Sequence, residues 1–138
     1  MMQDKPRNSV LIIGCGYIGR RVSALAQAEH SLVTGCVRSE QSAAQLDRSG
    51  IDSLIVDLDR TAATTAWGHG FDEVFYFAPP PAHGEQDPRM QAFLQALDNR
   101  VPPRRIVYIS TSAVYGDCQG AWISESQPVN PATSRGQR

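Results

Sequence analysis

Three glycines near the start of the chain have the spacing of a phosphate-binding turn. The stretch VLIIGCGYIGRRV places Gly14, Gly16 and Gly19 in a G-x-G-x-x-G pattern between an apolar run and a helical pattern. In such a turn the first glycine makes the bend, the second lets the backbone approach a pyrophosphate, and the third lets helix and strand pack closely. The helix N-terminus then offers free N–H groups to the phosphates. A sharp turn with no ligand is the alternative interpretation.

The end of the next apolar run indicates which dinucleotide this turn would hold. A site for NAD usually has Asp or Glu about 20 residues after the glycines, bonded to the ribose 2′-hydroxyl. Here the stretch reads Cys36-Val37-Arg38-Ser39 and has no carboxylate. Because arginine pairs well with phosphate, we predict NADP rather than NAD as the cofactor, held at Arg38 and Ser39. An arginine that is merely solvated at a strand end is the alternative.

A run of hydroxyl side chains, Ser110, Thr111 and Ser112, follows the last apolar run in RRIVYISTSAVYGD. From the residues alone it is a polar strand end, which is the commoner meaning of such a run. The cysteines and histidines of the chain show no metal-ligand spacing, so we predict no metal site.

Alternating apolar and amphipathic stretches predict the elements that position these residues. Apolar runs at 9–14, 31–37, 52–58, 73–78 and 104–110 are typical of buried strands. Helical patterns cover 17–29 and 40–49, the latter with Ser39 as N-cap, and Asp87-Pro88 begins a third helix. This alternation predicts an α/β fold, a doubly wound parallel sheet of about five strands in the order 3-2-1-4-5.

Length and composition fit one ordinary globular domain over residues 1–138, with 41% hydrophobic and 20% charged residues. Thirteen basic and 14 acidic residues give a net charge of −1, which predicts no nucleic-acid partner and no binding to an anionic membrane. No apolar run approaches the ~20 residues of a membrane helix. The three cysteines form no CxxC pair, so we predict a reduced, cytoplasmic protein.

With the glycine turn, VDLD after the third strand and YISTSAVYGD after the fifth, the chain resembles the extended short-chain dehydrogenase/reductases. More narrowly, it is similar to the NAD(P)-dependent epimerase/dehydratase family, which has a Rossmann fold and acts on nucleotide sugars. The resemblance runs from Ser9 to Gln137, and STSAVYGD is its most specific part. It implies an oxidoreductase or isomerase at the level of a nucleoside-diphosphate-sugar epimerase. It also implies a small-molecule substrate such as a nucleotide sugar, and a homodimer.

The resemblance implies further cofactor-binding residues beside the glycine turn and after the third and fourth strands, namely Tyr17, Ile18, Asp57, Leu58, Ala78 and Pro79. Asp57 and Leu58 would hold the adenine edge, whereas Ala78 and Pro79 would line the side of the adenosine ribose. An aspartate that simply terminates a strand is the alternative interpretation of Asp57.

The resemblance also assigns the chemistry. Thr111, four residues before Tyr115, matches the hydroxyl that bonds the substrate oxygen, with Ser110 and Ser112 as second choices. The family's acid–base pair is Tyr-x-x-x-Lys on the next helix, and here Arg135 stands at the tyrosine position. Because arginine stays protonated near neutral pH, it cannot be a general base. The chain therefore resembles an atypical branch in which cofactor binding survives without that pair.

In an extended family member the substrate half follows the fifth strand. We therefore expect a C-terminally truncated domain, inactive by itself, with residues 117–138 as a loosely packed tail in which Thr133 or Ser134 caps a helix. Two other interpretations stay open. One is a non-catalytic module that senses NADP(H) or serves as a scaffold. The other is a doubly wound domain that binds FAD or a mononucleotide.

Overall fold

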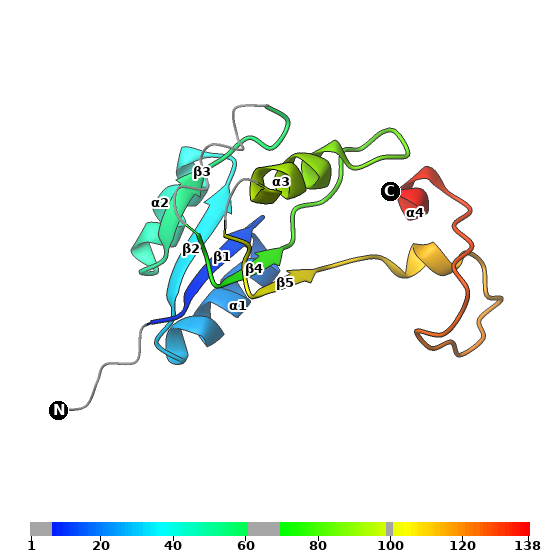
Figure 1. The fold of residues 1–138 in the computed structure, drawn as a ribbon, viewed down its shortest axis with the longest axis horizontal. Helices are drawn as coiled ribbons and strands as arrows, with labels where there is room; N and C mark the ends of the chain where they lie inside the picture. Colours follow the sequence, from blue (N-terminus) through cyan, green and yellow to red (C-terminus); the bar gives the residue numbers. More distant parts are fainter. Residues whose placement is uncertain (1–6, 61–69, 99–100) are drawn as a thin grey trace.

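A single parallel sheet forms the centre of the computed structural model, which describes residues 7–60, 70–98 and 101–138. Its strand order is β3-β2-β1-β4-β5 (Figure 1). The bounds are β1 Ser9–Ile13, β2 Leu32–Val37, β3 Asp52–Ile55, β4 Glu73–Tyr76 and β5 Arg105–Tyr108. The predicted doubly wound α/β sheet and its order 3-2-1-4-5 are thereby confirmed.

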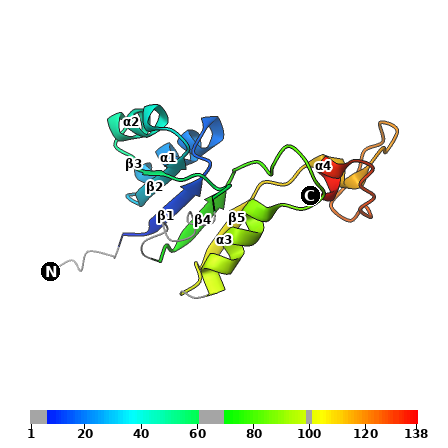
Figure 2. The same ribbon diagram turned by 90° about the horizontal axis from the view of Figure 1, so that it is seen from above.

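Helices cover both faces of the sheet, as Figure 2 shows from above. On one face lie α1 (Tyr17–Ala28) and α2 (Glu40–Arg48), and on the other lies α3 (Pro88–Asp98). The predicted caps are present. The Ser39 hydroxyl accepts a hydrogen bond from Ser42 N at 3.2 Å, and Asp87 Oδ1 accepts from the N–H groups of Arg89 and Met90, each at 3.1 Å. These caps fix where α2 and α3 begin.

Two apolar clusters lie on opposite faces of β1 and explain its unbroken apolar run. Leu11 and Ile13 pack with Phe93 of α3, whereas Val10 and Ile12 pack with Leu46 of α2. Successive side chains of a strand point to opposite faces, so a strand covered on both faces must be apolar at every position. The central strand is thus packed on both faces, and it ends at the glycine turn.

The ladders of the sheet end together at the level where β1 turns away. Ile13 pairs with Cys36 of β2 and with Tyr76 of β4, and Tyr76 in turn pairs with Tyr108 of β5. The runs predicted as strands at 52–58, 73–78 and 104–110 continue past this level, but the strands do not. A parallel ladder needs a neighbour to bond with, so the turn at Gly14 ends the ladder between β1 and β4, and β3 and β5 end with the strands that they pair with.

After β5 the chain extends away from the sheet and folds back on itself (Figure 1). It forms the 3₁₀ helix η2 (Ser112–Tyr115) and the single turn α4 (Ser134–Gln137). Asn130 N donates to the Val114 carbonyl at 2.8 Å, and Gly136 is buried against η2. Among the described residues, no helix reaches the length and apolarity that crossing a bilayer takes.

Candidate functional site

Contacts in the glycine turn exclude a side chain at Gly14 and crowd one at Gly19. Gly14 has a φ of +81°, and a Cβ there would lie 2.6 Å from the backbone N of Ala78. A Cβ at Gly19 would lie 3.0 Å from the Ile12 side chain, so α1 packs directly on β1. The predicted roles of a tight bend and of close helix–strand packing match this geometry.

Gly16 differs, because nothing lies within 4 Å of the position its Cβ would take. It precedes α1, whose N-terminus has no side-chain cap and no acidic residue in its first turn. The free N–H groups and the positive end of the helix dipole therefore face open space. This is the arrangement that binds phosphate at helix N-termini.

A cleft of about 730 Å³ opens above the glycine turn, at the carboxyl ends of the strands. It lies where the strand order reverses between β1 and β4, which is where open α/β sheets bind ligands. Ten predicted cofactor residues line it: Gly14, Gly16, Tyr17, Ile18, Gly19, Arg38, Ser39, Leu58, Ala78 and Pro79. Its volume falls within the usual range for cofactor pockets.

Asp57 is the predicted cofactor residue that is not among the cleft-lining residues. Its Oδ1 accepts a hydrogen bond from the backbone N of Asp59 at 3.1 Å, which is the local bond of an Asx turn. The turn directs the chain so that Leu58 and Asp59 line the cleft instead.

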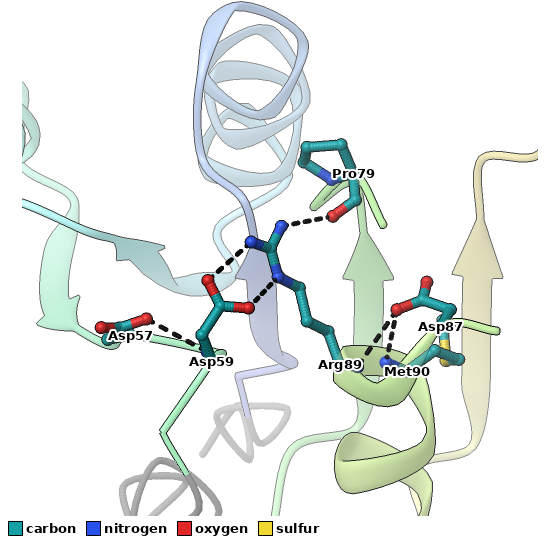
Figure 3. A network of polar contacts seen from close by, with 6 residues as sticks. All are labelled: Asp57, Asp59, Pro79, Asp87, Arg89 and Met90. Carbon is teal, nitrogen blue, oxygen red and sulfur yellow. Dashed lines mark hydrogen bonds and ion pairs between the residues drawn. The ribbon is translucent and has the colours of Figure 1, made fainter. Parts of the chain in front are cut away.

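An ion pair in the cleft wall was missed by the sequence analysis. Arg89 of α3 donates from Nε to Asp59 Oδ1 and from Nη2 to Asp59 Oδ2, each at 2.7 Å (Figure 3). Its Nη1 donates to the Pro79 carbonyl at 2.8 Å. We call this arrangement the Asp59–Arg89 clamp. It joins the segments that follow β3 and β4 to the first turn of α3.

The clamp residues had no signal in the sequence. Thirty positions separate the two partners. Asp59 ends the VDLD stretch, but the resemblance assigns roles there only to Asp57 and Leu58, and Arg89 stands in no motif. The nearest clue is the pair Asp87-Pro88, which predicts a helix start and so places Arg89 in its first turn. Hydrogen bonding to Arg89 is the main cause that lowers the pKa of Asp59, so both groups are charged at neutral pH.

Arg38 and Ser39 lie where β2 passes into α2, and both line the cleft. The Ser39 hydroxyl donates to Ser42 Oγ at 3.0 Å while it accepts from Ser42 N. Within the described part of the chain, Arg38 forms no ion pair. A guanidinium that is both unpaired and beside the cleft is available to an anionic group of a ligand.

The hydroxyl run of Ser110, Thr111 and Ser112 does not line the cleft. Ile109, the residue just before the run, is the last one along the chain that does. Ser110 and Ser112 are exposed and Thr111 is half-buried. Thr111 Oγ1 accepts a hydrogen bond from Ala113 N at 3.3 Å and caps η2. A Cβ at Gly136 would lie 2.7 Å from the Ala113 carbonyl, so the turn that carries Arg135 packs against η2. The structure thus brings Arg135 and Thr111 to the same small subassembly.

The thiols near the glycine turn are poor nucleophiles in this setting. Burial raises the pKa of Cys15, and it raises the pKa of Cys36 to about 12. Thiolates are the reactive form of cysteine, so neither thiol is activated. In the part of the chain that the structure describes, no three His, Cys, Asp or Glu side chains are grouped to hold a metal ion.

The sequence profile of the NAD dependent epimerase/dehydratase family matches residues 10–135. Protein YeeZ of Escherichia coli strain K12 is 30% identical over 138 residues, covering 92% of this chain and 48% of that protein. The chain therefore spans about half the length of the curated relatives it matches.

Solved structures have the same fold over nearly the whole chain. A functionally unknown conserved protein from Silicibacter pomeroyi DSS is 27% identical, with a TM-score of 0.74 over 94% of this chain and 45% of that one. A UDP-galactose 4-epimerase is 19% identical, with a TM-score of 0.75 over 93% of this chain and 46% of that one. At that level of identity the second likeness is one of fold.

Proposed function

Since this chain belongs to the NAD dependent epimerase/dehydratase family, we propose that its cleft binds NADP(H) in the manner of a nucleoside-diphosphate-sugar epimerase or a related reductase. The observation that carries the proposal is the open space at Gly16 below the uncapped N-terminus of α1. A pyrophosphate fits there because backbone N–H groups face it and no side chain intervenes.

The preference for NADP over NAD rests on Arg38. Its guanidinium lines the cleft with no ion-pair partner among the described residues, and it follows the strand whose end usually carries the ribose-binding carboxylate. A 2′-phosphate would gain a charge-assisted hydrogen bond from Arg38.

Calorimetric titration with NADPH and with NADH tests both parts of this proposal. We expect tight NADPH binding, weaker NADH binding, and a loss of roughly tenfold or more in NADPH affinity for Arg38→Asp, with little change for NADH. Arg48→Asp, at the other end of α2, is the matched control. Equal losses for both nucleotides would remove the basis for the preference. Binding of neither nucleotide by the unmodified protein would overturn the proposal as a whole.

For the chemistry we propose that hydride passes at the nicotinamide near Thr111, against a hydroxyl or ketone of a small substrate such as a nucleotide sugar. Ser110 and Ser112 are the flanking alternatives. Turnover of a panel of sugar nucleotides with NADP⁺, measured in a longer chain that includes the substrate half, tests the assignment. Thr111→Ala should abolish most of that turnover while Thr111→Ser retains it, because serine keeps both the hydroxyl and the cap of η2. Full turnover in Thr111→Ala would refute the role.

A second candidate function, a non-catalytic NADP(H) sensor or scaffold, is favoured by Arg135. This residue occupies the tyrosine position on a turn packed against η2, and a guanidinium cannot take a proton near neutral pH. The same sugar-nucleotide panel separates the two functions. NADPH binding without any turnover favours the sensor, whereas turnover excludes it.

A further inference from the structure

The Asp59–Arg89 clamp places a carboxylate in the wall of the cleft that Arg38 also lines. All three nitrogens of the Arg89 guanidinium are engaged, two by Asp59 and one by the Pro79 carbonyl (Figure 3). The Arg89 side chain is 14% exposed and that of Asp59 is 51% exposed. Arg89 is therefore occupied and largely covered, while Asp59 remains open to the cleft.

Asp59 is influenced by both arginines. The hydrogen bond from Arg89 is the largest cause of its lowered pKa, and the charge of Arg38 lowers it further. Asp59 and Arg38 also line the same cleft, although no ion pair joins them in the described structure. The second strand lacks an acidic residue at its end, but the segment after β3 brings one to the same neighbourhood.

The net charge of Arg38, Asp59 and Arg89 determines how strongly this part of the cleft attracts an anion. With Arg89 in place, two guanidinium groups and one carboxylate leave a net charge of +1. Without the charge of Arg89, Arg38 would face an unpaired carboxylate and the net charge would be zero. Without the charge of Asp59, the net charge would be +2. A ligand with a 2′-phosphate responds to these changes more strongly than the same ligand with a 2′-hydroxyl.

We propose that the Asp59–Arg89 clamp determines specificity at the ribose 2′ position, because Arg89 neutralises Asp59 and so leaves the charge of Arg38 available to a 2′-phosphate. This inference rests on the proposed NADP(H) site and adds two residues to it that do not themselves contact the phosphate. Arg89 and Asp59 act through Arg38 and are positioning residues in this sense.

The test compares adenosine 2′,5′-bisphosphate with 5′-AMP, two probes that differ by the 2′-phosphate. The measured quantity is the ratio of their affinities, determined by calorimetry at low ionic strength for the unmodified protein and three variants. We expect Arg89→Gln to lower the ratio about fivefold, Asp59→Asn to raise it, and the double variant Asp59→Asn/Arg89→Gln to return it close to the original value. At 1 M salt these differences should shrink, because the charges are partly exposed.

The ratio of the two affinities distinguishes an effect of charge from a simple disruption of the cleft wall. If the clamp only holds the backbone in place, Arg89→Gln weakens both probes equally, the double variant weakens both as well, and the ratio never moves. That result would overturn the proposal. A double variant whose ratio stays as low as that of Arg89→Gln would also overturn it. If Arg89→Gln does not fold, the affinity ratio of Asp59→Asn alone tests the proposal: we expect that ratio to rise, and an unchanged ratio would overturn the proposal.

Arg104→Gln is the matched control. It removes an arginine that pairs with Glu73 at 2.9 Å, at the amino ends of β4 and β5 and therefore at the other edge of the sheet from the cleft. Its ratio should equal that of the unmodified protein. Failure of the unmodified protein to bind either probe would overturn the proposed cofactor site and this inference together, whereas normal binding with unresponsive variants would overturn this inference alone.

Discussion

Gly14 and Gly16 belong to one turn, yet the chain needs them for different reasons. Gly14 is required by the fold, because its φ is +81° and the backbone of Ala78 occupies the place of a Cβ. Gly16 has open space around it, and the proposed pyrophosphate is what would require a glycine there. Glycine thus meets a folding constraint at Gly14 and, in our proposal, a binding constraint at Gly16.

We predict that Gly14→Ala destabilises the protein by about 2 kcal/mol or more, because a left-handed conformation and a backbone clash must both be relieved. Gly16→Ala should lose little stability but much of the NADPH affinity, because its methyl group would project into the phosphate position. Urea unfolding and NADPH titration of both variants check this. Equal stability losses in the two would contradict the distinction.

The three cysteines should react in a fixed order. Cys15 and Cys36 are buried and burial raises the pKa of each thiol, whereas Cys118 is half-buried in the segment after β5. We expect a thiol reagent at neutral pH to label one cysteine quickly, and Cys118→Ser to abolish that fast phase. Labelling of the other two should follow only on unfolding. Fast labelling of two or more cysteines in the folded protein would show that the glycine turn opens.

The sequence predicts site residues well when they lie close together along the chain. Gly14, Gly16 and Gly19 act within one turn and Arg38 follows one strand, so spacing predicted where they lie in the cleft. The Asp59–Arg89 clamp depends on two segments that come together only in the folded protein. The sequence between them does not indicate that Asp59 and Arg89 form an ion pair. The clamp therefore became visible only with the structure.

At the scale of elements, helix starts were predicted better than strand ends. Ser39 and Asp87 predict where α2 and α3 begin, because a cap is a hydrogen bond between residues only two or three positions apart. A strand end depends on its neighbour, which the local sequence does not show. The apolar run 52–58 continues beyond Ile55, for example, but β3 ends there because Val37 is the last residue of β2.

The cap of α3 offers a test of this element. Asp87→Ala removes the acceptor for two backbone N–H groups and should cost about 1–2 kcal/mol of unfolding free energy. Asp87→Asn retains an acceptor oxygen and should cost less. Because Arg89 lies in the turn that Asp87 caps, the alanine variant should also weaken binding of NADPH. An alanine variant as stable as the unmodified protein would show that the apolar packing of Met90, Phe93 and Leu97 holds the helix without its cap.

At the scale of the whole molecule, two carboxylates make stability depend on pH. Hydrogen bonds from Ser9 lower the pKa of Asp72, and hydrogen bonding to Arg89 lowers that of Asp59. A carboxyl group whose pKa is lower in the folded than in the unfolded protein stabilises the fold at pH values above its unfolded-state pKa of 3.8. That contribution is lost as the pH falls through the folded-state pKa. We therefore expect stability to decrease as the pH is taken below about 4.

Urea unfolding midpoints measured between pH 7 and pH 2.5 check this. Asp72→Asn should lower the midpoint at pH 7 and reduce its dependence on acid. Asp47→Asn, at an exposed position of α2, should leave the profile unchanged. A profile that is equally steep in Asp72→Asn and in the unmodified protein would assign the acid sensitivity to other groups.

The position of β1 in the sheet has a consequence for the order of folding events. Ser9 pairs with Leu32 of β2, 23 residues away, but Val10 pairs with Glu73 of β4, 63 residues away. The longer loop costs about 0.9 kcal/mol more entropy to close. We therefore expect β1, β2 and β3 to assemble first and β4 to join later, at a seam where Ser9 and Asp72 exchange hydrogen bonds across 63 positions. Both strands that border the reversal in strand order meet at this seam, so the cleft would be the last part of the molecule to take shape.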